Sequence, residues 1–423
     1  WGGGAGNDRA TVPGAIAPLL ASFLVQLCGA FFNSFLYSQS QSDLYLENLN
    51  TISTSVPFLL IAPDSRAGAM GDVGVATSPD HNSIHWNASK MAFLEDDKGF
   101  SISYTPWLQD LVPEISLSYL SGFKRINSKS TIGGSLRYFS LGEIQFTDNS
   151  GQPISKFSPN EFALDGAYSM KLSENFSAGL AMRYIYSNLT GGINVPGGAP
   201  TKPGNAFAVD LSSYYQSNSF EIEDKDAYWS AGFNISNVGN KISYTDAGEE
   251  YFLPMNARVG TQLFMELDEY NSISFAFDLN KLLVPTPPVY SVDESGDPIL
   301  DQNGDQLIEA GMDPNVGVIQ GMFQSFGDAP GGVQEEFNEL MFSFGAEYWY
   351  LKQFAFRGGY FHENENKGAR KYFTVGVGMR MNVFSLDMAF LLPATQGVRS
   401  PLANTLRFTM LFDMAALYGT DKN

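Results

Sequence analysis

Few residues of this chain have the types and spacing that catalysis or metal binding would need. His81 and His85 lie four positions apart beside Asp80, a spacing that would place two imidazoles on one face of a helix. No third ligand is evident in the sequence, and Pro79 argues against a long helix, so we expect two packed histidines there. With three histidines in the chain, no Ser/His/Asp arrangement is visible. We therefore predict a protein that is not an enzyme and that uses no cofactor and no metal.

An acidic segment offers a second candidate for cation binding. Asp301, Asn303 and Asp305 alternate as the first ligands of a calcium-binding loop do. Gln306 stands where such a loop needs glycine, and Met312 stands where it needs a bidentate glutamate. Calcium binding by this acidic segment stays an open alternative.

The dominant pattern of the chain, from about residue 99 to residue 413, is an alternation of opposite chemistries over segments of roughly ten residues. Successive strand residues point to opposite sides of a sheet, and about ten tilted residues cross a bilayer. In 161–171 an apolar face alternates with a small or charged one: Phe162, Leu164, Tyr168 and Met170 against Ala163, Asp165, Ala167, Ser169 and Lys171.

Fourteen such segments can be counted, an even number as in bacterial outer-membrane barrels. The sequence therefore predicts an all-β fold, a 14-stranded antiparallel transmembrane β-barrel with an N-terminal plug and a long helix-containing extracellular loop. The expected strands are 98–107, 113–125, 130–142, 160–171, 175–187, 204–216, 225–237, 254–266, 271–281, 339–351, 353–361, 370–381, 382–392 and 402–413.

Charged residues of both signs fall on the faces opposite the apolar ones. A lipid-facing Arg or Lys at mid-bilayer would cost about 2–4 kcal/mol, so we expect these side chains in the lumen. Mixed signs favour a lumen filled by side chains and a plug over a wide selective pore. The predicted ionic network of lumen and plug comprises Arg137, Asp165, Arg183, Asp210, Arg258, Asp278, Glu347, Arg357, Arg380, Asp387 and Arg407.

Composition and targeting signals agree with this location. The formal charge of −20 leaves no basic stripe for nucleic acid. Residues 14–37 form an apolar run that we interpret as a secretory signal peptide, with cleavage near Ser38 or Ser40. Cys28 lies inside this run, and Leu27 before it disfavours a lipoprotein signal, so the mature chain has no cysteine. We expect upstream residues and a signal peptide in 1–40, a plug in 41–97, a barrel in 98–414 and a tail in 415–423.

The predicted loop 282–338 is the other unusual segment. The stretch from Leu282 to Leu340 holds eleven acidic residues and no Lys or Arg. Asp313 as N-cap, Pro314 at the first position and Gly327 as a stop predict a helix over 315–326. We place Val316, Ile319, Phe323 and Phe326 on one face, with Val318, Met322 and Ser325 beside it.

Two interpretations of this helix stay open. It could fold back as a lid that buries its own apolar face on the barrel mouth. Alternatively, it presents an adaptable apolar surface to another protein, with the acids as a polar rim. In the second interpretation the partner-binding residues are Met312, Val316, Val318, Ile319, Met322, Phe323 and Phe326.

Several motifs resemble those of one known family. Arg66 to Asp80, Asn82 to Asn87, Gly311 to Phe326 and Asp328 to Gly332 closely resemble the PorV family, outer-membrane shuttles of the type IX secretion system in Bacteroidota. The likeness spans essentially the whole expected mature chain. That family is similar to the FadL fatty-acid transporters, which are fourteen-stranded barrels with an N-terminal hatch. Where the hatch of those transporters has Asn-Pro-Ala, this chain has Asn87-Ala88-Ser89.

The resemblance implies a function that the spacing of residues does not show. Such a shuttle docks on a SprA-type translocon in the outer-membrane lipid, binds the C-terminal domain of secreted cargo and passes it to a PorU-type attachment complex. The rival hypothesis is a FadL-like transporter that moves a hydrophobic small molecule across the outer membrane. A transporter would need an apolar pocket in the lumen and a displaceable hatch.

Overall fold

The computed structural model describes one compact unit that begins at Asn50. Residues 1–49, with the predicted signal peptide and Cys28, lie outside the described residues, as does the predicted tail 415–423. The described residues are 50–108, 114–147, 152–192, 200–245, 248, 250–295, 297–302, 304–394 and 405–414.

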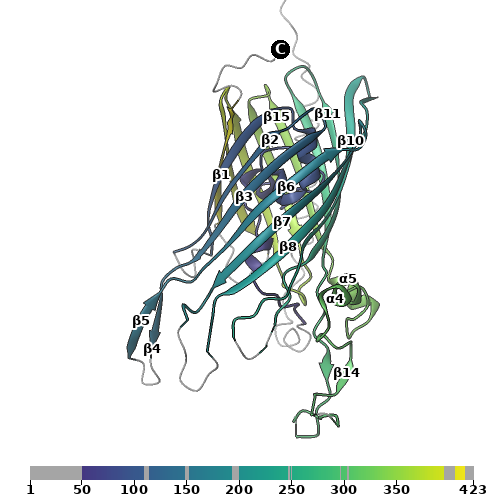
Figure 1. The fold of residues 1–423 in the computed structure, drawn as a ribbon. Helices are drawn as coiled ribbons and strands as arrows, with labels where there is room; N and C mark the ends of the chain where they lie inside the picture. Colours follow the sequence, from purple (N-terminus) through teal and green to yellow (C-terminus); the bar gives the residue numbers. More distant parts are fainter. Residues whose placement is uncertain are drawn as a thin grey trace, which may run out of the picture. The chain divides into compact units, whose positions relative to one another are not determined.

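Fourteen antiparallel strands of this unit close into a barrel (Figure 1). Each strand pairs with the next along the barrel, and β1 pairs with β19 to close the sheet. These strands are β1 (Lys98–Pro106), β2 (Ile115–Arg125), β3 (Ser130–Leu141), β6 (Asn160–Lys171), β7 (Phe176–Asn188), β8 (Gly204–Gln216), β10 (Lys225–Gly239), β11 (Asn256–Glu266), β12 (Ser272–Leu282), β15 (Met341–Tyr350), β16 (Phe354–His362), β17 (Lys371–Arg380), β18 (Phe384–Pro393) and β19 (Leu406–Asp413).

The predicted fold is confirmed, and all fourteen expected strands are present within a few residues of their expected bounds. Short strands outside the prediction extend the connections. β4 (Ile144–Thr147) pairs with β5 (Pro153–Phe157), β9 (Phe220–Ile222) extends the sheet at β10, and β13 (Val289–Tyr290) pairs with β14 (Ile308–Ala310).

The two ends of the barrel differ in their connections. At one end the strands are joined by short turns, as between β2 and β3 or between β15 and β16. At the other end lie the long connections, including the β4–β5 hairpin and the loop between β12 and β15 (Figure 1). We call this the long-loop end. Because neighbouring strands run in opposite directions, the connection from β12 to β15 is on the same end as those from β1 to β2 and from β18 to β19.

Apolar and polar residues alternate along the strands, so the barrel has an apolar outer face and a polar inner face. On β6, Leu164 and Tyr168 are exposed on the outside, whereas Asp165 and Ser169 are buried inside. The same alternation exposes Val375 and Val377 of β17. In a bilayer these outward apolar side chains contact the lipid chains, as the apolar side chains of a soluble protein contact its core.

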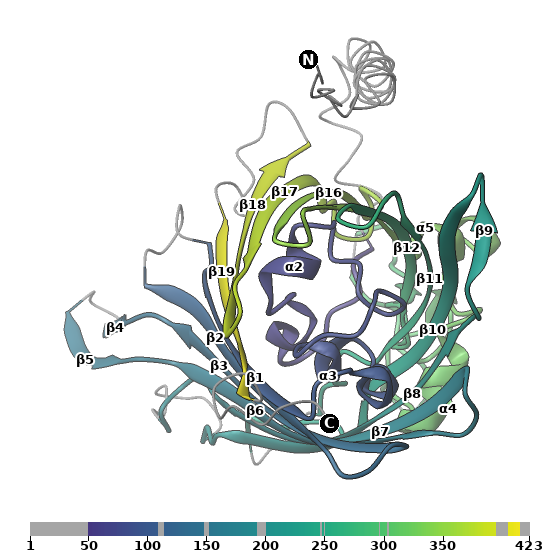
Figure 2. The same ribbon diagram turned by 90° about the horizontal axis from the view of Figure 1, so that it is seen from above.

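An irregular segment fills the lumen before β1 begins (Figure 2). It contains short helices: η3 (Pro57–Leu60), α2 (Ser65–Gly68), α3 (Ser83–Trp86) and η4 (Ala88–Phe93). Buried backbone groups need hydrogen-bond partners, and an irregular segment cannot supply them all itself. The wall therefore supplies some: Thr409 Oγ1 accepts from the Ser65 amide, Thr374 Oγ1 accepts from the Gly71 amide, and Ser230 Oγ donates to the Ala76 carbonyl.

The helix predicted over 315–326 is shorter than expected. α4 spans Val318–Gln324 with Gly317 at its N-cap, so the prediction of Asp313 as N-cap was wrong. The Asp313 carboxylate instead accepts from the Asn315 amide, which forms a turn before the helix. A second helix, α5 (Val333–Asn338), was not predicted. Among the described residues, every helix is too short or too polar to span a bilayer.

Candidate functional site

Two places in the molecule are candidates for function: the ionic lumen and the β12–β15 loop. In the lumen, cross-strand pairs join neighbouring strands. Arg183 of β7 lies opposite Asp165 of β6, with Nε 2.5 Å from its carboxylate, and its Nη2 is 3.0 Å from Asp210 of β8. On the far wall, Arg357 bridges Glu347 at 2.7 Å and Asp387 at 2.6 Å. Within these pairs the opposite charges neutralise each other inside the lumen.

Several lumen residues hold the plug instead. The Glu347 carboxylate also accepts from both Nε and Nη2 of Arg66 in α2, at 3.0 and 2.8 Å. Arg407 pairs with Asp72 of the plug at 3.0 Å. Asp278 accepts from the amides of Gly74 and Val75 at 2.8 and 3.0 Å. These contacts fix the plug to three separate strands.

The remaining predicted lumen residues make other contacts. Arg137 donates to the Leu59 carbonyl at 2.7 Å and approaches His85 Nδ1 at 2.5 Å. Arg258 donates to Asn280 and lies over the Trp86 ring at 4.7 Å. Arg380 is exposed at the end of β17, over the ring of Trp349 at 4.5 Å.

The two histidines of the plug contact different neighbours. His81 lies against the ring of Phe123, with the ring centroids 5.1 Å apart, whereas His85 contacts Arg137 and the edge of Trp86. Within the part of the chain that the structure describes, no group of three or more His, Cys, Asp or Glu side chains is placed to hold a metal ion. Asn303 of the calcium-like segment lies outside the described residues.

The plug motif that departs from the FadL pattern has a clear structural role. The Asn87 side-chain amide donates to the Val75 and Ser213 carbonyls, both at 2.9 Å. Its side-chain oxygen caps η4 by accepting from the Ser89 amide. Asn87 thus links two parts of the plug to β8.

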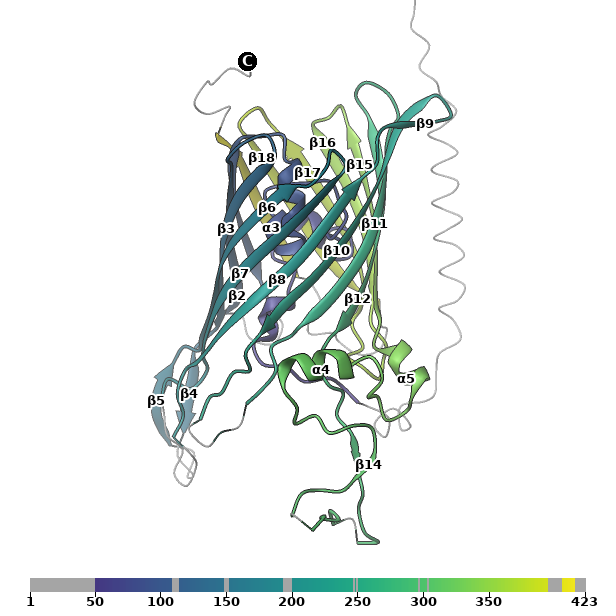
Figure 3. The ribbon, with the colours of Figure 1, turned by 45° about the vertical axis from the view of Figure 1, so that its right-hand side comes forward.

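The second candidate, the β12–β15 loop, carries α4 and α5 at the long-loop end (Figure 3). One face of α4 packs on the barrel: Val318 and Met322 contact a buried group that contains Met255, Leu283 and Val284. Gly321 lies against Phe252 and Pro285, where a Cβ would approach within 3.0 Å of both side chains. This face of α4 is therefore buried on the barrel, as the lid interpretation expects.

Six apolar side chains of the loop, on α4, on α5 and beside them, remain exposed, as the surface interpretation expects. We call this set the helix surface. Phe323 is 68% exposed, Val333 73% and Phe337 64%, values as high as those on the outer face of the barrel, although α4 and α5 lie beyond the strands. The helix surface comprises Met312, Ile319, Phe323, Phe326, Val333 and Phe337. Of the predicted partner-binding residues, Val318 and Met322 therefore face the barrel, Val316 is half-buried, and Met312, Ile319, Phe323 and Phe326 are exposed.

Ion pairs and hydrogen bonds anchor the base of this loop to the barrel. Lys281 at the end of β12 pairs with Glu336 at 3.1 Å and also with Glu339. Lys367 of the β16–β17 loop pairs with Glu335 and, at 3.0 Å, with Glu339. The Thr286 hydroxyl donates to Glu339 at 2.6 Å, and its amide donates to Asp328 at 3.1 Å. We call these residues the base cluster: Lys281, Thr286, Asp328, Glu335, Glu336, Glu339 and Lys367.

The pKa values of two carboxyl groups in the base cluster, Asp328 and Glu335, are shifted in opposite directions. Burial raises the pKa of Asp328 to about 6, and the neighbouring carboxylates of Glu336 and Glu339 add to the effect. Burial also acts on Glu335, but hydrogen bonds from Lys367 and the Gly331 amide outweigh it and hold the pKa of Glu335 below its usual value. With a pKa of about 6, the protonation of Asp328 changes close to neutral pH.

Sequence reasoning missed α5 and the base cluster. The signal for α5 was the pair of acids Glu335 and Glu336 in its first turn, where carboxylates favour a helix N-terminus. The base cluster had no local signal, because Lys281 and Lys367 lie far from their partners in the sequence.

Comparison with solved structures finds toluene transporters and a FadL homologue, each of low identity to this chain. The Pseudomonas putida toluene transporter TodX is 11% identical over 82% of this chain and 96% of its own, with a TM-score of 0.47. The Ralstonia pickettii toluene transporter TbuX is 12% identical over 86% and 98%, with a TM-score of 0.41. A Pseudomonas aeruginosa FadL homologue is 11% identical over 86% and 99%, with a TM-score of 0.39. A search of curated proteins finds no match.

A family model gives a more specific result. The model described as type IX secretion system protein PorV matches residues 45–289, which run from within the expected plug segment through β12 to the start of β13. This match covers more than half of the chain. It includes two of the four motifs that suggested the family, Arg66 to Asp80 and Asn82 to Asn87, while Gly311 to Phe326 and Asp328 to Gly332 lie beyond it. The protein therefore belongs to the PorV family of the type IX secretion system and is a β-barrel of the outer membrane.

Proposed function

We propose that this protein is a non-enzymatic shuttle of the type IX secretion system. It binds the C-terminal domain of secreted cargo at a SprA-type translocon and delivers that domain to a PorU-type attachment complex on the cell surface. Membership of the PorV family, which is not a family of enzymes, supports the secretion role. The structural observation that carries the binding role is the helix surface, whose large apolar side chains are exposed on a folded loop.

The helix surface has the properties of a docking site for a protein. Large exposed apolar side chains with a polar surround mark interaction surfaces. The base cluster holds α5 against the barrel, so less conformational entropy is lost when a partner binds. The acidic β13–β14 hairpin adjoins it in the same loop, so we expect the partner to combine apolar and basic side chains.

The packed lumen weighs against the rival transporter. A cavity lies between plug and wall and is lined by residues including Leu60, Trp86 and Arg258. The volume in it that water can occupy is about 30 Å³. That volume holds about two water molecules at roughly 15 Å³ each, and its lining is polar in part. A hydrophobic small molecule would need a wider and more apolar route.

Replacing Phe323 and Phe326 together with aspartate tests the proposal. Both side chains are exposed, so the barrel is expected to assemble, while two charges remove the apolar contact with cargo. We expect cargo to lose attachment to the cell surface and to stop co-purifying with the protein. Fractionation of cells and pull-down from solubilised membranes measure these effects, and the mobility of unheated protein on gels reports the folded barrel.

Phe220→Asp is the matched control, because Phe220 is an exposed ring on β9 at the short-turn end. This variant should retain cargo attachment. Normal attachment in the Phe323/Phe326 variant would contradict a binding role for the helix surface.

A further inference from the structure

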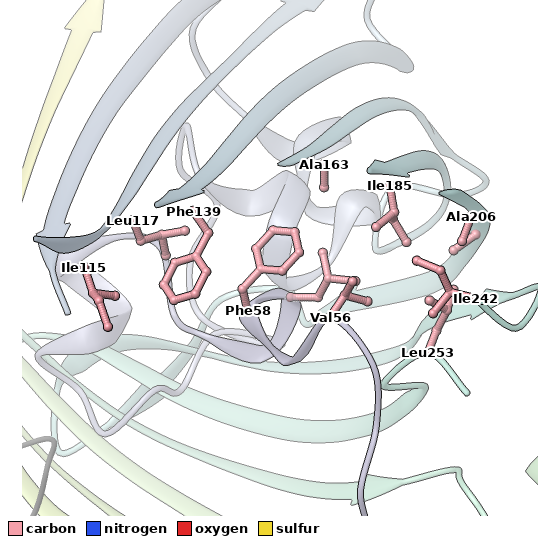
Figure 4. Close-up of a cluster of buried hydrophobic side chains, with 12 residues drawn as sticks. Val56, Phe58, Ile115, Leu117, Phe139, Ala163, Ile185, Ala206, Ile242 and Leu253 are labelled. Atoms are coloured by element: carbon pink, nitrogen blue, oxygen red, sulfur yellow. The ribbon is translucent and has the colours of Figure 1, made fainter. Parts of the chain in front are cut away.

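The lumen is not uniformly polar, because its wall becomes apolar at the long-loop end. Inward-facing residues there form one buried apolar group, which we call the recess (Figure 4). Several of its wall residues are alanines, which leave space beside larger side chains. The recess consists of Ile115, Leu117, Phe139, Ala163, Ile185, Ala206, Ala208, Ile242 and Leu253.

The chain fills the recess with its own N-terminal segment. Val56, Phe58 and Leu59 are at most 2% exposed and belong to the same buried group. The Phe58 ring stacks on Phe139, with centroids 5.9 Å apart and an interplanar angle of 7° (Figure 4). These residues enter as apolar side chains from a short 3₁₀ turn that pairs with no strand.

The backbone of this segment is strained where it enters the recess. Val56 has φ 45° and ψ 49°, a left-handed conformation that a β-branched residue rarely adopts. Such conformations persist when the surrounding contacts enforce them. Two kinds of contact enforce it here. Val56 and Phe58 pack in the apolar group of the recess, and Arg137 donates a hydrogen bond to the Leu59 carbonyl.

The same segment also contacts the loop that carries α4. Ile52 packs with Val318 and Met322 of α4 on the group around Met255. The Asn50 side-chain amide donates to the Pro287 carbonyl at 3.1 Å and to Glu335 at 3.0 Å. Residues 50–61, which we call the strap, therefore connect the inside of the barrel with the loop outside it.

We propose that the recess is a binding site for an apolar ligand, that Val56, Phe58 and Leu59 are its tethered ligand, and that the seated strap holds α4 in position. The ligand class follows from the lining: the ring of Phe139 and aliphatic side chains, with Trp107 and Tyr244 packed against them. The charged group beside it, Arg137, donates to the Leu59 carbonyl. The inference does not depend on cargo binding, because it concerns the position of α4 in the protein alone.

Phe58→Ala tests the inference in purified full-length protein. Loss of the ring should unseat the strap, so hydrogen exchange of the α4 amides is expected to accelerate by about tenfold or more, while the barrel strands stay protected. Toluene, a probe of the size of the lost ring, should slow this exchange again by filling the vacated site, as small aromatics fill apolar cavities.

Phe123→Ala is the control, since it removes a buried ring of β2, 6% exposed against 1% for Phe58, from a different apolar group in the lumen. It should leave α4 unchanged. The inference is overturned if exchange rises in the strap but not in α4, if Phe123→Ala has the same effect on α4, or if toluene leaves the exchange of Phe58→Ala unaltered.

A crosslinked pair covers the case in which Phe58→Ala does not assemble. Phe58→Cys with Phe139→Cys, in a Cys28→Ser background, can be joined by a short thiol crosslinker. We expect slow α4 exchange in the joined form and fast exchange in the free dithiol form. Equal exchange in the two forms would contradict the coupling.

Discussion

At the scale of single residues, the lumen shows how charges are tolerated at membrane depth. Arg183 is held by Asp165 and Asp210, and all three side chains are almost fully buried. Removing one member of a buried ion pair leaves an uncompensated charge, which costs about 3–5 kcal/mol. We predict that Arg183→Met lowers the free energy of unfolding of the barrel by about this amount, measured by urea titration with tryptophan fluorescence.

Lys156→Met is the control for that prediction, because the Lys156–Glu143 pair is exposed on the β4–β5 hairpin. Exposed pairs contribute little to stability, so no measurable change is expected. Equal stability of the Arg183 variant and the unmodified protein would show that the buried pairs are dispensable.

The pKa of Asp328 makes the β12–β15 loop sensitive to pH. Its folded value of about 6 lies above the ordinary 3.8, so the folded loop prefers the protonated carboxyl. The resulting stabilisation is fully present below pH 3.8 and is lost as the pH rises through about 6. Glu335 has the opposite sign, but its lowered pKa affects the loop only below about its ordinary 4.5.

We therefore predict that hydrogen exchange of 318–340, corrected for intrinsic rates, speeds up between pH 5 and pH 7.5. Asp328→Asn should remove most of this pH dependence and protect the loop at pH 7.5. Asp313→Asn, at an exposed carboxylate of the same loop, should keep the dependence. An unchanged pH profile in Asp328→Asn would refute the assignment.

At the scale of elements, the plug and the wall meet with almost no free space. A Cβ on Gly359 of β16 would lie 2.1 Å from the Gly71 amide nitrogen and from the Met70 carbonyl carbon, whereas one on Gly358 would have no atom nearer than 3.9 Å. Gly359→Ala must therefore displace the backbone of the plug, which we expect to destabilise the plugged barrel by about 1–3 kcal/mol.

Gly358→Ala is the matched control, because it adds the same methyl group on the outer face of the same strand. The two variants can be compared by thermal unfolding and by proteolysis of the plug. Equal stability of the two variants would contradict the close packing of the plug against β16.

At the scale of the whole molecule, the fold predicts which end faces the outside of the cell. Long connections of outer-membrane barrels are extracellular and short turns periplasmic. In a Cys28→Ser background, Tyr290→Cys on β13 should react with a membrane-impermeant maleimide on intact cells. Glu221→Cys on β9 should react only after the outer membrane is permeabilised. The reverse labelling pattern would invert the proposed orientation and remove the helix surface from the cell surface.

The sequence by itself determined the barrel, because strand alternation is local: whether Leu164 faces lipid and Asp165 the lumen depends only on their neighbours. The same alternation put charged residues on the faces opposite the apolar ones, and the sequence located a helix near α4. Only the tertiary structure decided which side of α4 is buried, where Lys281 and Lys367 find their carboxylates, and that Phe58 occupies the recess. Each of these depends on residues more than twenty-five positions apart, as in Lys367–Glu339 at a separation of 28 and Lys281–Glu339 at 58. Short-range patterns carry no information about such contacts.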